Sequence, residues 1–153
     1  MNFLLSLIIF LPLAGAIILL FLPNRRSQRV WALIVTLVTF VVSLALLLNW
    51  QNGEPGMQFV ERLPWIPQFN IQYLLGVDGI SLWLVLLTTF MGPLVILFSW
   101  DSIKERTRAY YFAMLVMETA MLGVFLALDL VLFYVFWEIS LVPMYFIIGL
   151  WGG

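Results

Sequence analysis

Long apolar runs separated by short polar segments dominate the sequence. A run of about twenty apolar residues can cross the roughly 30 Å hydrocarbon layer of a bilayer as one helix. The runs predict five transmembrane helices, at about residues 3–22, 30–50, 80–100, 110–127 and 130–150. Residues 50–79 form a long extramembrane loop, in which residues 57–75 mix apolar and polar positions and favour a short hairpin. We therefore expect an all-α integral membrane protein, with residues 1–153 forming a single transmembrane segment.

Polar residues mark where two of these helices begin. The stretch from Tyr110 to Leu150 would be about 60 Å long as one helix, twice the bilayer thickness. The chain must therefore fold back once, and Asp129 is suited to cap the helix that follows. Asp78 and Ser81 are typical helix-start residues and predict the beginning of the third span. The fourth and fifth spans are then antiparallel neighbours joined by a very short turn.

Composition excludes several classes of function. The chain is 64% hydrophobic and 10% charged, whereas soluble domains are closer to half apolar and a quarter charged. It contains neither cysteine nor histidine, so it lacks thiolate ligands, the commonest metal ligand and the usual proton shuttle. A net charge of −1 offers no basic face for nucleic acid. We expect no catalytic residue, metal site or cofactor-binding site in this chain.

The basic residues predict how the chain sits in the membrane. They follow the first span (Arg25, Arg26, Arg29) and the third (Lys104, Arg106, Arg108). Two spans separate these groups, so both lie on one side, and the excess of basic residues in cytoplasmic loops makes that side the cytoplasm. The N-terminus and the acidic loop of residues 50–79 are then expected outside.

The fifth predicted span carries one carboxyl group near its middle, Glu138. Counting from Leu130, Glu138 lies about 12 Å along the helix, close to the middle of the bilayer. An acidic side chain costs on the order of 3 kcal/mol there, and such a group by default marks a functional site. A carboxyl that binds and releases a proton at this depth fits a proton carrier, and Glu138 is our main candidate. The alternative is a buried glutamate that is hydrogen-bonded to support helix packing.

Three neighbours of Glu138 support a polar function for this helix. Pro143 cannot donate a hydrogen bond to the carbonyl of Ile139, so we expect a bend just after the acid. Tyr134 and Tyr145 lie four positions before and seven positions after Glu138, which places all three side chains on one helix face. Both tyrosines are further candidates for proton translocation.

Two other acids are candidates for the same pathway. Glu118 lies near mid-depth in the fourth span, and it is either a relay partner of Glu138 or a surface acid. Asp129 lies in the turn between the fourth and fifth spans, where it is first of all a helix cap.

Four segments in order carry a resemblance to a known family. They are Gly76–Ser81 (GVDGIS), Gly123–Leu130 (GVFLALDL), Phe133–Glu138 (FYVFWE) and Leu141–Tyr145 (LVPMY). Together they resemble the antiporter-like family of subunit M, or chain 4, of the proton-pumping NADH–quinone oxidoreductase, respiratory complex I. The segment around Glu138 is specific, whereas GVDGIS alone would be weak. The resemblance covers essentially the whole chain but only the N-terminal third of the family's length.

The resemblance implies a role and a set of partners. Glu138 matches the principal proton-channel carboxyl of the family, which pairs with a lysine on a later helix. Lys104 is the single lysine of this chain and lies in a loop, so we expect the chain to be a truncated form. The implied function is that of a translocase subunit of NADH–quinone oxidoreductase. NADH, flavin, iron–sulfur clusters and quinone would then be bound by the other subunits of the complex.

The resemblance also implies a multi-pass protein of a bacterial inner (plasma) membrane, rather than of the mitochondrial inner membrane. Two alternatives remain open. The chain could be a subunit of a related multi-subunit sodium–proton antiporter or hydrogenase membrane arm. It could also be a structural fragment that inserts into the membrane without transporting anything.

Reporter fusions test the expected orientation. We expect alkaline phosphatase to be active when fused within residues 50–79 and inactive when fused at Arg29, because the enzyme folds only outside the cytoplasm. Enzyme activity on whole cells is the measurement. The opposite pattern would reverse the predicted sidedness.

Overall fold

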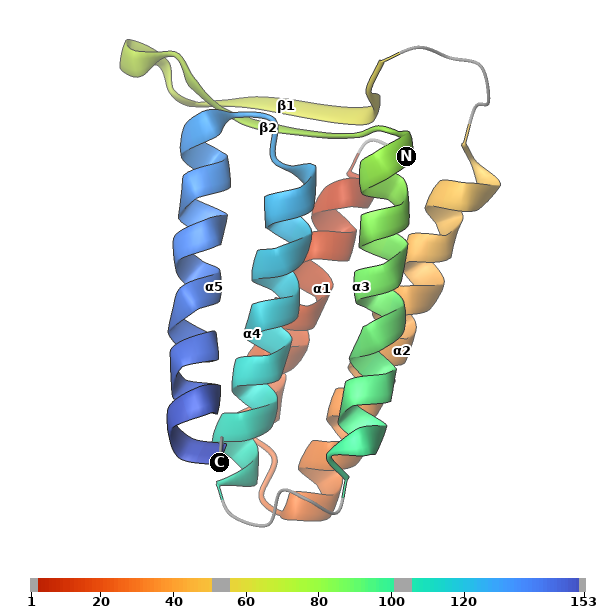
Figure 1. Cartoon of the computed structure of the whole chain (residues 1–153), viewed down its shortest axis with the longest axis vertical. Coiled ribbons are helices and arrows are strands. Elements are labelled where there is room, and N and C mark those ends of the chain that lie inside the picture. Colours follow the sequence, from red (N-terminus) through yellow and green to blue (C-terminus); the bar gives the residue numbers. More distant parts are fainter. Residues whose placement is uncertain (1–2, 51–55, 101–105, 152–153) are drawn as a thin grey trace.

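The computed structural model describes residues 3–50, 56–100 and 106–151. Its helices stand side by side, and a β-hairpin lies across one end of the bundle (Figure 1). The elements in chain order are α1 (Leu4–Leu19), α2 (Arg25–Leu48), β1 (Gln58–Ile66), a short 3₁₀ turn (Pro67–Phe69), β2 (Ile71–Val77), α3 (Gly79–Phe98), α4 (Thr107–Leu126) and α5 (Leu130–Trp151). Helices α2 to α5 are long and apolar enough to cross a membrane, whereas α1, with 16 residues, is shorter.

The expected order of five helices is confirmed, and four of the five predicted spans are long enough to cross a membrane. Three boundaries differ by three or more residues: the end of α1, the start of α2 and the start of α4, which begins at Thr107 instead of residue 110. The predicted loop after the first span is largely the first turn of α2, which begins at Arg25 instead of residue 30. The reason is a cap, because the Asn24 side chain accepts a hydrogen bond from the backbone N–H of Ser27 at 3.1 Å. The first helix ends at Leu19, before the expected residue 22.

The hairpin expected within residues 57–75 is present and makes the chain less than purely helical. Strands β1 and β2 pair antiparallel, with Arg62 opposite Leu74. The connection is tight because Pro67 starts a 3₁₀ turn and Asn70 adopts a left-handed backbone with φ of 55°. Proline and asparagine are suited to these two turn positions. The prediction of an all-α protein is therefore wrong in one respect, because the described residues also form one two-stranded sheet.

A buried carboxylate fixes the hairpin to the first helix. Glu61 of β1 is only 4% exposed and accepts hydrogen bonds from the backbone N–H groups of Leu5 at 2.7 Å and Ser6 at 3.1 Å. It also accepts a hydrogen bond from the Ser6 hydroxyl, which lies 2.5 Å from the Tyr73 hydroxyl of β2. The first N–H groups of a helix have no partner within that helix. Glu61 therefore caps α1 and at the same time attaches both strands to it.

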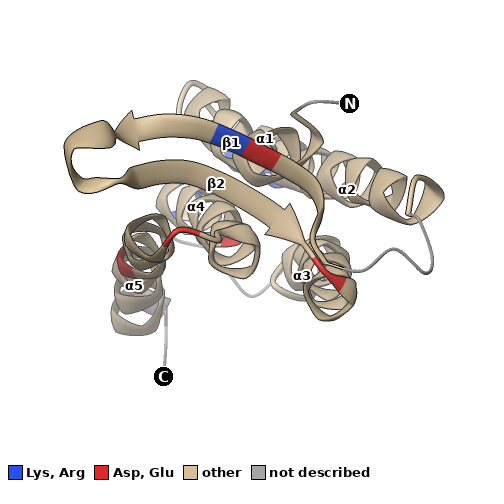
Figure 2. Cartoon of the chain, turned by 90° about the horizontal axis from the view of Figure 1, so that it is seen from above, with Lys and Arg blue, Asp and Glu red and all other residues tan. Residues whose placement is uncertain are grey.

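Two aspartates confirm the predicted helix starts. Asp78 and Ser81 form a capping box at the start of α3, with hydrogen bonds of 2.8 and 2.9 Å. Asp129 accepts hydrogen bonds from two backbone N–H groups in the first turn of α5, at 2.9 and 3.2 Å. It also accepts one from the backbone N–H of Gln72 in β2 at 2.8 Å. Figure 2 looks down on this end and shows α1 on the β1 side of the hairpin, with α4 and α5 on the β2 side.

Helix α4 is central and α5 is peripheral. Helix α4 packs against each of the other four helices, whereas α5 packs mainly against α4. The close approach of α4 and α5 depends on Gly123, because the Phe136 ring of α5 occupies the space that a Cβ there would fill. Small residues at such contacts let membrane helices approach closely. The face of α5 that points away from α4 is left uncovered within the described chain.

A larger residue at Gly123 should weaken this packing. A Cβ at Gly123 would lie 2.3 Å from ring carbons of Phe136, so we expect Gly123→Ala to lower the free energy of unfolding by about 1–3 kcal/mol. The matched control is Gly149→Ala in α5, where nothing lies within 4 Å of a new Cβ and alanine is the better helix former. Unfolding by denaturing detergent, followed by tryptophan fluorescence, measures both. Equal stability of the two variants would contradict the packing argument.

Candidate functional site

Glu138 lies near the middle of α5, as the sequence predicts. The Asp129 cap fixes the start of the helix, and Glu138 follows about 12 Å along its axis. Its side chain is exposed within the described chain, so the expected burial of this carboxyl is not met there. The reason is helical geometry. Phe136 faces α4 and is 5% exposed, and a residue two positions later lies about 200° further round the helix.

The two tyrosines lie on the same outer face as Glu138. Tyr134 is 60% exposed and Tyr145 is 75% exposed, and Tyr134 lies one helical turn before Glu138, close enough for the two side chains to interact. Pro143 lies on the opposite, buried side of α5, where it faces Ala109 of α4. The helix remains continuous on both sides of this proline, up to Trp151. The structure thus brings together the predicted pair of Glu138 and Tyr134 on one polar stripe.

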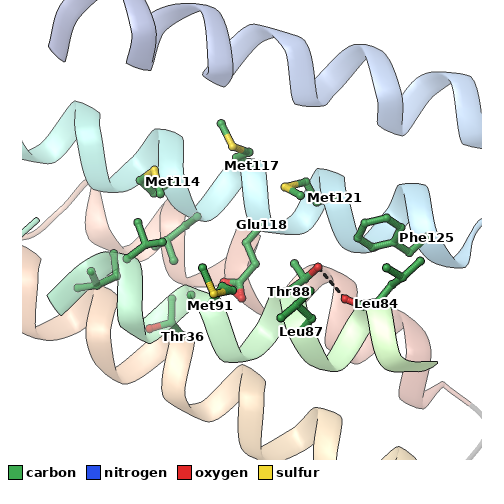
Figure 3. A pocket seen from close by; sticks show the side chains of 14 residues that line it. Thr36, Leu84, Leu87, Thr88, Met91, Met114, Met117, Glu118, Met121 and Phe125 are labelled. Carbon is green, nitrogen blue, oxygen red and sulfur yellow. Dashed lines mark hydrogen bonds between the residues drawn. The ribbon is translucent and has the colours of Figure 1, made fainter. Parts of the chain in front are cut away.

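Glu118 is buried and faces away from α5. Its side chain is 7% exposed, so the interpretation as a surface acid is wrong. It points from α4 toward Gly92 of α3, into a cavity of about 360 Å³ that residues of α2, α3 and α4 line (Figure 3). Neither carboxyl oxygen has a hydrogen-bond partner among the described residues. Because no residue of α5 lines this cavity, the two intramembrane acids do not share a site.

The carboxyl of Asp129 has the contacts of a structural cap. The backbone N–H of Gln72 and those of the first turn of α5 hold the pKa of Asp129 below its usual value. The backbone N–H of Ser81 lowers the pKa of Asp78 in the same way. Both carboxyls are therefore charged at neutral pH. Asp129 also lies about 13 Å along the helix from Glu138, so the structure does not bring these two candidates together.

Three polar contacts between elements, two between helices and one between a strand and a helix, were not predicted from the sequence. Ser43 of α2 and Thr89 of α3 lie 2.8 Å apart through their hydroxyl oxygens. The Thr107 hydroxyl of α4 donates to the side-chain carbonyl of Gln28 in α2 at 2.6 Å. The third contact is the Glu61 cap, which the sequence showed only as a loop acid. The signal for the first two was a buried polar residue in a mostly apolar helix, which needs a partner when no water is near.

The described residues contain no group of three acidic side chains placed to hold a metal ion. The carboxylates of the described residues are spread over separate caps and separate helix faces.

Known proteins match this chain over nearly its full length. The family model described as NADH-ubiquinone oxidoreductase chain 4, amino terminus, matches residues 6–129. NADH-quinone oxidoreductase subunit M of Rhodobacter capsulatus is 50% identical over 159 aligned residues, which cover 100% of this chain and 30% of the relative. NADH-ubiquinone oxidoreductase chain 4 of Arabidopsis thaliana is 47% identical over 97% of this chain and 30% of its own length. The F(420)H(2) dehydrogenase subunit M of Methanosarcina mazei is 39% identical with the same coverage.

A solved structure agrees with these relatives. A chain of respiratory complex I from Thermus thermophilus with bound NADH superposes with a TM-score of 0.74 and 29% identity, over 95% of this chain and 29% of that chain. The present chain thus spans about 30% of the length of the curated relatives it matches. By the family model and by these identities, the chain belongs to the family of NADH-ubiquinone oxidoreductase chain 4, whose amino-terminal part it matches.

Proposed function

We propose that this chain serves in the membrane arm of an NADH–quinone oxidoreductase and takes part in proton translocation coupled to quinone reduction. The observation that carries the proposal is Glu138, an acid near the middle of an apolar helix with Tyr134 one turn away on the same face. Ionisable groups in the middle of a membrane helix usually belong to ion or proton pathways, because burying them in lipid costs free energy. Family membership supplies the second support.

The outer face of α5 supports a larger assembly around Glu138. A carboxyl and two tyrosines on one stripe make a poor surface for hydrocarbon, so we propose that further protein covers this face. The relatives are about three times as long as this chain, which leaves ample sequence for such helices. The family resemblance implies a lysine on a later helix as the partner of this acid.

The mechanism is electrostatic. A negative Glu138 is stabilised by the opposing lysine, and the Tyr134 hydroxyl, one helical turn away, can donate a hydrogen bond to the carboxylate. When charge rearrangement elsewhere in the complex draws the lysine away, the carboxylate loses its partner and takes up a proton. Return of the lysine expels the proton toward the other side. Each proton moves against about 2.3 kcal/mol per 100 mV.

The distribution of charge supports the proposed orientation. Arginines occupy the first turns of α2 and α4, at the end opposite the hairpin: Arg25, Arg26, Arg29, Arg106 and Arg108 lie in or beside these turns. The helix dipole disfavours cations at helix N-termini, so helix stability does not explain why arginines gather there. The excess of basic residues in cytoplasmic segments of membrane proteins does explain these arginines. We propose that this end faces the cytoplasm of a bacterial cell, with the N-terminus and the hairpin outside.

Partner subunits complete the proposed function. NADH, flavin, iron–sulfur clusters and quinone would be bound by those subunits, and this chain would act only on protons. The names of the relatives favour this reading over a sodium–proton antiporter or a hydrogenase membrane arm. A relative named F(420)H(2) dehydrogenase subunit M indicates that closely similar chains serve a different electron donor. A structural fragment without transport is the remaining alternative.

Removing the proton-binding group of Glu138 tests the proposal. In the full-length membrane complex, we expect Glu138→Gln to lower proton pumping by more than about tenfold, because an amide cannot bind and release a proton. Assembly should survive, since the side chain keeps its size. Quenching of a pH-sensitive dye in inverted vesicles measures pumping, and a native gel measures assembly. Ser140→Ala, which removes a hydroxyl bonded only within its own helix, is the control. Normal pumping with glutamine at position 138 would refute the proton role.

The Tyr134 hydroxyl gives a finer test. Tyr134→Phe removes a donor within reach of the Glu138 carboxyl, whose hydrogen bond would be worth about 1 kcal/mol, and should lower pumping roughly twofold to fivefold. Tyr145→Phe is the matched control, since Tyr145 lies on the same face but about 10 Å along the helix from Glu138. Both variants are compared by initial rates of dye quenching. An equal effect of the two substitutions would argue against a specific contribution of Tyr134.

A further inference from the structure

The cavity between α2, α3 and α4 is separate from the proposed Glu138 site. It measures about 360 Å³ and its walls are almost wholly apolar, with methionines prominent at the α4 side (Figure 3). Glu118 is the sole titratable residue among the described residues that line it. A volume of this size is within the range of ligand-binding pockets and exceeds what one water molecule needs.

Close packing holds the Glu118 carboxyl at the wall of α3. A Cβ added to Gly92 would lie 2.9 Å from Oε1 of Glu118 and 3.3 Å from Oε2. The missing side chain at Gly92 therefore leaves the space that the carboxyl occupies. A carboxyl that is more than nine-tenths buried and has no hydrogen-bond partner among the described residues is costly in its charged form.

The other polar groups of the cavity offer acceptors rather than donors. Thr36 donates its hydroxyl to the backbone carbonyl of Ala32 at 2.9 Å, and Thr88 donates to that of Leu84 at 2.8 Å. Neither hydroxyl proton is left over for a carboxylate. No lysine or arginine lies among the described lining residues, and a hard cation such as sodium or calcium needs several oxygen ligands, which this wall does not supply. The chemistry that fits the carboxyl is therefore a proton, with water as its carrier.

We propose that Glu118 is a second proton-binding site, distinct from Glu138, which exchanges its proton with water admitted to the α2–α3–α4 cavity. In this step a hydronium ion gives its proton to the carboxylate and leaves as water, and no electrons move. Gly92 provides the room in which the carboxyl sits. The inference rests on the proposed function, because the proton held by Glu118 is one that the complex translocates.

The first experiment detects the protonated carboxyl without measuring transport. Dicyclohexylcarbodiimide is lipophilic and adds to protonated carboxyl groups, so it should label Glu118 in the intact wild-type complex in membranes. Peptide mass spectrometry should find a gain of one reagent mass at Glu118. A water-soluble, charged carbodiimide at the same concentration should leave the residue unmodified. Absence of the lipophilic label overturns the inference, and this result needs no variant to fold.

The second experiment measures the consequence for transport. Glu118→Gln keeps the size of the side chain but cannot exchange a proton, so the number of protons pumped per electron pair should fall at least about twofold. Val124→Ala, on the same helix but outside the lining of the cavity, is the matched control and should pump normally. If Glu118→Gln does not assemble, Glu118→Asp retains the carboxyl and should assemble and pump. Normal pumping by Glu118→Gln overturns the inference even if the wild-type residue is labelled.

The two proposals fail in distinguishable ways. If Glu138→Gln abolishes pumping while Glu118→Gln pumps normally, the Glu118 inference fails and the function proposed for Glu138 stands. If both variants pump normally, both proposals fail. Loss of pumping in Glu118→Gln together with a labelled wild-type Glu118 supports a second site.

Discussion

The backbone N–H groups at the starts of α1, α3 and α5 need hydrogen-bond acceptors from outside their own helices, and this need organises one end of the structure. These three helices begin at the same end of the bundle, and each presents backbone donors that the helix itself cannot satisfy. Glu61, Asp78 and Asp129 supply one carboxylate to each start. A negative charge is also the favourable partner for the positive end of a helix dipole. Glu61, Asp78 and Asp129 therefore share one structural task, which is to accept hydrogen bonds from the three helix starts at this end.

The same bonds tie the hairpin to the bundle. Glu61 belongs to β1 but caps α1, and Asp129 caps α5 while accepting a bond from Gln72 of β2. The backbone N–H of Leu128 adds a bond of 2.8 Å to the carbonyl of Leu74 in β2. The hairpin is thus fastened to the first and the last helix of the described chain. These bonds fix where α5 begins, and hence how far along the bundle Glu138 lies from the hairpin.

The two intramembrane acids have opposite surroundings for simple geometric reasons. Glu118 belongs to the central helix, so most faces of α4 are covered, and Gly92 leaves room for its carboxyl. Glu138 belongs to the peripheral helix and lies on the side away from α4, beside the Tyr134 hydroxyl. Glu118 has no hydrogen-bond partner among the described residues, whereas Glu138 has Tyr134 as a polar neighbour one turn away on its own helix. The two acids therefore lie in separate and different surroundings.

The sequence by itself determined the membrane class, the order of five helices, the hairpin and the caps at Asp78 and Asp129. These features depend on runs of apolar residues and on hydrogen bonds between residues close in the chain, which a linear pattern records. The family and the position of Glu138 along its helix were likewise readable from short segments. Only the tertiary structure decided that Glu61 caps a helix 56 positions away, that Glu118 is buried against Gly92, and that Glu138 faces outward. Those outcomes depend on how each helix is rotated about its axis and on which helix becomes central, and both are set by packing between distant segments.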